Sequence, residues 1–113
     1  MKVDISRVKI FVTIPNENVE DVRNAVCQVG AGVIGNYTHC TYSVNGIGTF
    51  VPNEDANPHI GTKNKLEFVR EEKLEFICEV NKVKDVIKAI RYSHPYEEPA
   101  IDIVPLIDET AFD

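Results

Sequence analysis

Near the start of the chain, apolar and polar residues alternate, and directly afterwards apolar residues recur at helical spacing. From position 8 to position 14 every second residue is Val or Ile, the period-two pattern of a strand with one buried face. Pro15 ends this strand. Asn16 or Asn18 can cap the following helix, and Gly30 can stop it. The apolar stripe of this predicted helix is Val19, Val22, Val26 and Val29.

The middle of the chain predicts a hairpin followed by a long loop. A strand is expected from Asn36 to Val44, and the Asn45-Gly46 pair is a strong signal for a hairpin turn. A short return strand would follow between Gly48 and Val51. From Pro52 to Asn64 the residues that favour turns predominate, so a long loop is expected there. Long loops in compact domains are usually functional or mobile.

The second half repeats the order strand, helix, strand. Leu66 and Phe68 begin an extended piece, and alternation from Leu74 to Val80 predicts a clear strand. Asn81 is the expected cap of the second helix, which His94-Pro95 ends. Its apolar stripe is Val83, Val86, Ile87 and Ile90. A last strand is predicted from Ile101 to Leu106, and Pro105 indicates that this strand either terminates there or lies at an edge of the sheet.

The order β-α-β-loop-β-α-β predicts an α+β fold of the ferredoxin-like, double split βαβ type. Two helices would cover one face of an antiparallel sheet. Phe11, Tyr37 and Ile77 would fall on the other face by alternation, and a monomer would expose them. Packing of that face against further subunits is therefore expected. At 113 residues we expect one domain, 1–113, with frayed ends at 1–6 and 108–113.

Composition excludes several classes of function. A net charge of −6 argues against nucleic-acid binding through phosphate contacts. No apolar run is long enough to cross a membrane. The three cysteines, Cys27, Cys40 and Cys78, are odd in number and far apart, which indicates reduced thiols and a cytoplasmic location.

The segment from Arg91 to Ala100 carries more polar chemistry than a helix stop needs. His94, Tyr96, Glu97 and Glu98 stand close together in it. One interpretation is structural: the histidine caps the last helical carbonyls, the tyrosine packs on the sheet, and the carboxylates are solvated. The other is a ligand or metal pocket at a subunit junction. A metal site would need further ligands, and His39, Cys40 or His59 are the candidates.

Two further motifs are weaker. Gly46 and Gly48 resemble part of a phosphate loop, but the lysine and the following helix are missing. The loop that holds Asn57 and His59 is the better candidate for a binding surface. Cys40 cannot readily be activated by His39, because adjacent residues on a strand point to opposite faces.

Three segments together resemble one family: Gly30 to Cys40, Gly46 to Pro52 with Ala56 to Gly61, and His94 to Ala100. The set is similar to the PII/CutA-like domain that is inserted in many bacterial members of the Nif-three family (Ngg-one-interacting factor three, YqfO-like). The resemblance implies a trimer. The longer members carry a dinuclear metal site in a flanking α/β domain. None of those ligands transfers to this chain, and neither does a cyclohydrolase activity.

The leading hypothesis is a non-catalytic, cytoplasmic, homotrimeric module that regulates or senses a ligand. Its binding residues would be His94, Tyr96, Glu97, Glu98, Gly46, Gly48, Asn57 and His59. The alternative is a CutA-like binder of a divalent metal ion, with His94, Glu97, His39 and His59 as ligands. A small hydrolase using His94 with Glu97 or Glu98, and a module that docks on a Nif-three-like metal-binding protein, are the remaining hypotheses.

Overall fold

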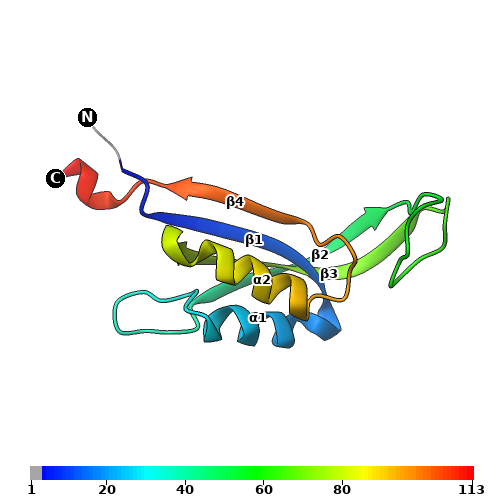
Figure 1. Ribbon diagram of the computed structural model, residues 1–113, viewed down its shortest axis with the longest axis horizontal. Coiled ribbons are helices and arrows are strands. Elements are labelled where there is room, and N and C mark those ends of the chain that lie inside the picture. Colours follow the sequence, from blue (N-terminus) through cyan, green and yellow to red (C-terminus); the bar gives the residue numbers. More distant parts are fainter. Residues whose placement is uncertain (1–3) are drawn as a thin grey trace.

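A four-stranded antiparallel sheet with the strand order β2-β3-β1-β4 forms the centre of the computed structural model, which describes residues 4–113. Both helices lie on the same face of this sheet (Figure 1). The predicted α+β, ferredoxin-like architecture is therefore confirmed. The elements are β1 (Arg7–Pro15), α1 (Val19–Gln28), β2 (Thr41–Phe50), β3 (Glu67–Glu79), α2 (Val83–Ser93) and β4 (Ile101–Leu106).

The core lies between the sheet and the two helices, where the sequence pattern placed it. The alternating residues of β1 are buried, and on β3 they meet Leu74, Phe76 and Cys78. Val19, Val22 and Val26 of α1 and Val86 and Ile90 of α2 close this layer from the other side. Burial of a Val or Ile side chain stabilises a fold by about 1.5–3 kcal/mol, so this stripe of side chains fixes which face of the sheet the helices cover.

The predicted hairpin turn at Asn45-Gly46 is wrong. β2 runs without interruption through this pair, and Gly46 does not adopt a positive φ. The reason is the length of β3, which pairs with β2 over the whole register from Thr41 opposite Phe76 to Phe50 opposite Glu67. Continuous pairing along this ladder outweighs the local turn preference of two residues. The β2–β3 pair consequently extends beyond the helices, with the loop 51–66 at its tip (Figure 1).

Neither helix is capped by an asparagine side chain, although Asn18 does occupy the predicted cap position of α1. Each helix begins after a short 3-10 turn, Asn16–Asn18 before α1 and Val80–Lys82 before α2. Asn18 occupies the cap position of α1 but makes no side-chain hydrogen bond there, and Asn81 lies inside the second turn. α1 starts directly after Asn18, whereas the second turn moves the start of α2 to Val83, one position later than a cap at Asn81 indicates. Val29 lies beyond the end of α1 and is exposed.

The face of the sheet opposite the helices carries apolar side chains, and we call it the open face. Phe11 and Ile77 lie on it and are half-buried. Tyr37 does not, because the second strand starts five residues later than predicted and Tyr37 forms an isolated bridge with Ile34 instead. Further side chains on this face, with their exposed fractions, are Tyr42 (66%), Val44 (51%) and Val104 (44%).

β4 is an edge strand, which is one of the two alternatives that Pro105 indicated. Beyond it the chain forms a 3-10 turn, Glu109–Phe112. Arg7 and Asp108 form an ion pair, with 3.2 Å between Nη2 and Oδ2. Residues 1–3 of the predicted frayed N-terminus lie outside the described residues. Within residues 4–113 no helix is both long enough and apolar enough to cross a bilayer.

Candidate ligand-binding site

The segment between α2 and β4 passes around the edge of β1 from the helix face to the open face. It can do so because β4 begins at Ile101 and pairs with β1 no further than Val12. The last residues of β1 therefore have no β4 neighbour. Pro95 prevents α2 from continuing, and the chain turns across this free edge. As a result Tyr96, which follows a helix on one face, reaches Glu71 on the other.

The side chain of His94 connects the segment 94–100 to β1 by a hydrogen bond. Its Nε2 atom lies 2.8 Å from the carbonyl oxygen of Thr13, one residue beyond the last β4 pair. Its Nδ1 atom accepts a hydrogen bond from the backbone N–H of Tyr96 at 3.1 Å. Since a carbonyl accepts and an amide N–H donates, the ring is the neutral tautomer with its proton on Nε2. The predicted capping of helical carbonyls by this side chain is wrong.

The surroundings of His94 hold the ring neutral. The side chain is buried, and this burial lowers the pKa of His94 below its ordinary value. The Thr13 carbonyl and the nearby Glu71 act in the opposite direction without reversing the effect. Both ring nitrogens are used by backbone groups, so His94 is a structural residue of the site.

Glu71 and Tyr96 form a buried polar pair at the centre of the site. The Tyr96 hydroxyl donates to Glu71 Oε2 at 3.1 Å, and Glu71 is only 8% exposed. Burial is the main reason that the pKa of Tyr96 is raised, and the carboxylate adds to it. Gly48 makes room for this pair, because a Cβ atom at that position would collide with Glu71 Oε1.

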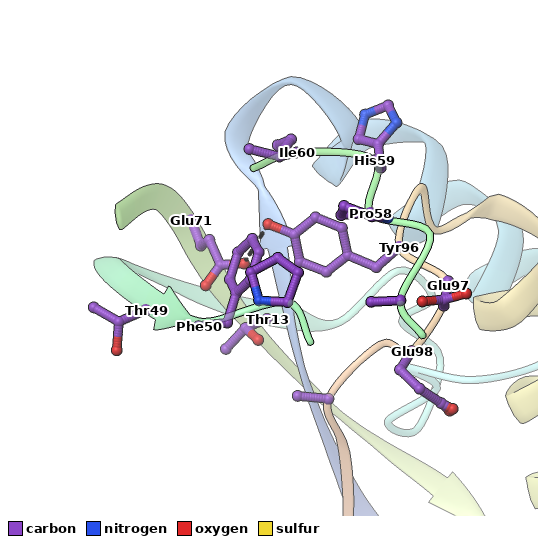
Figure 2. Close-up of a pocket in the computed structure, with 13 residues that line it drawn as sticks. Thr13, Thr49, Phe50, Pro58, His59, Ile60, Glu71, Tyr96, Glu97 and Glu98 are labelled. Carbon is purple, nitrogen blue, oxygen red and sulfur yellow. Dashed lines mark hydrogen bonds between the residues drawn. The ribbon is translucent and has the colours of Figure 1, made fainter. Parts of the chain in front are cut away.

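The loop 51–66 covers the pair and leaves a cavity of about 290 Å³ beneath it. Glu97 holds the loop by accepting a hydrogen bond from the backbone N–H of Asn57 at 2.9 Å. Phe50 at the end of β2 packs edge to face on Tyr96, with 5.9 Å between ring centroids. Figure 2 shows the Tyr96 ring between Pro58 and the Phe50–Glu71 side of the cavity. The remaining lining residues are Thr13, Thr49, Pro52, Ala56, His59, Ile60, Glu97, Glu98 and Ala100.

The structure brings together most of the residues predicted to bind a ligand. Tyr96, Glu97, Glu98 and His59 all line the cavity. Three more contribute indirectly or not at all. Gly48 lies behind the carboxylate of Glu71, and Asn57 contributes its backbone N–H. At Gly46 a Cβ atom would find open space, with no other atom within 4 Å.

The structure does not bring all four predicted metal ligands together, although Glu97 and His59 line the same cavity. His39 is exposed in the loop before β2 and contacts Thr38, whereas His59 lines the cavity. His94 has no nitrogen left for a metal ion. In the part of the chain that the structure describes, no group of three or more His, Cys, Asp or Glu side chains is arranged to hold a metal ion.

Sequence reasoning missed Glu71, Phe50 and Thr13. Glu71 lies in the charged run Arg70 to Lys73, which is typical of a solvated strand surface. A buried carboxylate has no signature of its own in such a run. The one sequence signal for a buried side chain in this run was the pair of glycines at 46 and 48. That signal can be interpreted only when the register of β2 and β3 is known, because the register places these glycines opposite Glu71 and Val69.

Fold and site together define a PII/CutA-like domain with a small pocket at the tip of its sheet. CutA from Synechococcus elongatus shares the fold, with a TM-score of 0.69 over 98% of this chain and 87% of that chain, at 12% identity. A Bacillus cereus protein related to NIF3 superposes with a TM-score of 0.79 at 42% identity, over 94% of this chain and 27% of that chain. No protein-family model matches the chain.

Curated relatives identify the family. The GTP cyclohydrolase 1 type 2 homolog of Halalkalibacterium halodurans is 46% identical over 101 residues, which is 89% of this chain and 27% of that protein. The protein of the same name from Listeria innocua is 47% identical over 103 residues, which is 90% of this chain and 28% of that protein. The chain thus spans little more than a quarter of the length of these relatives. It belongs to the Nif-three family through the segment that it shares with them.

Proposed function

We propose that this chain is a cytoplasmic, non-catalytic ligand-binding module whose site is the pocket between the loop 51–66 and the segment 94–100. The observation that carries the proposal is the pocket itself. Its polar centre, Glu71 with Tyr96, is already in place, and the loop is already held over it by the bond between Glu97 and Asn57. A site formed before its ligand arrives costs little ordering free energy on binding.

The pocket has the chemistry of binding rather than of group transfer. His94 would be the natural acid or base of the segment, yet both of its nitrogens are occupied by backbone groups. Glu97 is engaged by the loop, and Glu98 lies 3.5 Å from Arg91. The other polar side chains at the cavity are the Glu71 carboxylate, the Tyr96 phenol, the His59 ring and two threonine hydroxyls, and together with the apolar walls they select a ligand by shape and charge.

We further propose that the module works as a homotrimer, assembled through the open face. Tyr42, Val44 and Val104 expose apolar area on that face, next to the half-buried Phe11 and Ile77. Exposed apolar surface of this kind marks an interaction site, and a closed ring buries it on every copy. Three subunits is the number that the PII/CutA-like resemblance implies. Light scattering at micromolar concentration should therefore give three times the mass of one chain, and a stable monomer would exclude the assembly.

A small-molecule library screened by nuclear magnetic resonance tests the pocket. Hits are expected to shift amide signals of Ile60 and Tyr96, and Ala56→Phe, which fills the cavity, should abolish these shifts. Ala111→Phe adds the same ring outside the pocket and should leave binding intact. A library that yields no ligand at this site, or ligands that bind Ala56→Phe as well as they bind wild type, would refute the proposed function.

A further inference from the structure

The charged side chains that line the pocket are mainly acidic. Its ionisable lining residues, apart from the Tyr96 phenol, are three carboxylates, Glu71, Glu97 and Glu98, and one histidine, His59. No Lys or Arg side chain lines it in the described part of the chain. The guanidinium of Arg91 approaches Glu98 at the exposed rim, at 3.5 Å, and is not part of the cavity lining. An anionic ligand would therefore enter an acidic cavity without a compensating cation.

Glu71 is the most informative member of this set. More than nine-tenths of the residue is buried, and the carboxylate faces the cavity. Tyr96 donates to Oε2, whereas Oε1 lies over Gly48 and receives no hydrogen bond from residues 4–113. No basic group of the same residues forms an ion pair with it within 4.0 Å. A buried carboxylate with one neutral donor lacks the cation that normally accompanies such a group.

The walls of the cavity suit a positively charged group on an apolar body. Phe50 and Tyr96 present two aromatic rings beside the carboxylate, and a cation over an aromatic face gains electrostatic stabilisation. Pro52, Pro58 and Ile60 add further apolar surface to the lining. A volume of about 290 Å³ is at the lower end of small-molecule sites, which favours a compact ligand.

We propose that the pocket binds a small organic cation, with its ammonium or amidinium group at Glu71 and its apolar body between Phe50, Tyr96 and the loop prolines. This inference rests on the proposed function and names the chemical class of its ligand. A bare divalent metal fits less well, because no group of three or more potential metal ligands is arranged there in the described residues. Each of the three carboxylates also already has a partner: the Tyr96 hydroxyl, the Asn57 N–H or Arg91.

Three probes of nearly the same shape test the inference: benzamidine, which is a cation, benzamide, which is neutral, and benzoate, which is an anion. Each is titrated into the whole chain while amide signals of the pocket are followed. Benzamidine should bind at least about tenfold more tightly than benzamide, because its charged donors meet a carboxylate, and benzoate should bind most weakly. The shifts should centre on Glu71, Tyr96 and Ile60.

Glu71→Gln should remove the preference for benzamidine over benzamide, since it keeps the shape and removes the charge. Glu72→Gln is the matched control, because this neighbour on β3 points to the other face and does not line the cavity. The comparison of the three probes on wild type decides the question even where Glu71→Gln does not fold.

Each other outcome has a definite meaning. If benzamide or benzoate binds as tightly as benzamidine or more tightly, the proposed preference for a cation is refuted, but the pocket remains a binding site. If an equimolar amount of zinc displaces benzamidine, the proposal of an organic cation is refuted in favour of a metal ion. If no probe binds to wild type and the Glu71→Gln variant loses its oligomer, the proposal of an organic cation is refuted. The partner of Glu71 would then be a basic side chain from a second copy of the chain. Failure of every probe and of the whole library overturns the proposed function as well.

Discussion

Replacement of His94 by leucine tests the central structural role assigned within the site. Leucine has a similar volume but offers neither a donor to the Thr13 carbonyl nor an acceptor to the Tyr96 N–H. A buried polar backbone group that loses its partner costs about 1–3 kcal/mol. Two such groups in a part-buried position predict that His94→Leu lowers the free energy of unfolding by about 2–4 kcal/mol at pH 7.5.

The pH dependence gives a second, independent measure. The pKa of His94 is lowered in the folded protein, so below its ordinary value of 6.5 the unfolded chain binds a proton that the folded chain does not. Stability is therefore complete above pH 6.5 and falls as the pH drops through it, until the folded pKa is reached. His94→Leu lacks this proton. The stability difference between wild type and variant should accordingly shrink between pH 7.5 and pH 5.5.

Urea unfolding followed by circular dichroism, at fixed protein concentration, measures both effects. His39→Asn is the matched control, because His39 is exposed, its ring contacts the neighbouring Thr38, and asparagine tolerates its φ of 57°. It should leave both the stability and its pH dependence within about 0.5 kcal/mol of wild type. A His94→Leu protein as stable as wild type at pH 7.5, or a stability difference that does not change with pH, would refute the assigned role of His94.

Three further predictions concern the pocket and the open face. Gly48→Ala should displace the Glu71 carboxylate and cost about 1 kcal/mol through the lost Tyr96 bond, whereas Gly46→Ala, with nothing within 4 Å, should be neutral; equal urea midpoints would contradict this. Glu97→Gln should weaken the hold on the loop and speed hydrogen exchange at the Asn57 amide, while Glu98→Gln should leave that amide unchanged; unaltered exchange in Glu97→Gln would show that the loop is held otherwise. Val44→Asp should dissociate the oligomer in light scattering and Tyr92→Asp, on exposed helical surface, should not; an intact Val44→Asp oligomer would place the interface elsewhere.

The fold was predictable wherever a pattern extended over several residues. Alternation located β1, and Pro15 remained its last residue; β4 was predicted with its observed bounds, Ile101–Leu106. The errors fell where a short local signal competed with long-range pairing. Asn45-Gly46 is a strong turn signal, but the ten consecutive pairs between β2 and β3 depend on strand length and register, which no local window contains.

The site was predictable on one side only. The surplus of polar residues between His94 and Glu98 and the loop beginning at Pro52 were both named as candidate binding segments, and the structure places them around one cavity. The roles within the segment could not be assigned, because they depend on contacts distant in the chain: His94 with Thr13 spans 81 positions, and Tyr96 with Glu71 spans 25. Each partner is unremarkable in its own stretch of sequence.

The position of the pocket links ligand binding to assembly. Thr13 and Glu71 belong to the open face by register, on the same side of the sheet as Tyr42 and Val44. A subunit that packs on these exposed side chains would therefore border the loop 51–66 and the mouth of the cavity. If that neighbour contacts the loop in its closed position, assembly stabilises the closed pocket, and by thermodynamic reciprocity the ligand stabilises the assembly to the same extent. If the proposed pocket and the proposed interface both form on this face of the sheet, the loop held by Glu97 is the segment through which they would be coupled.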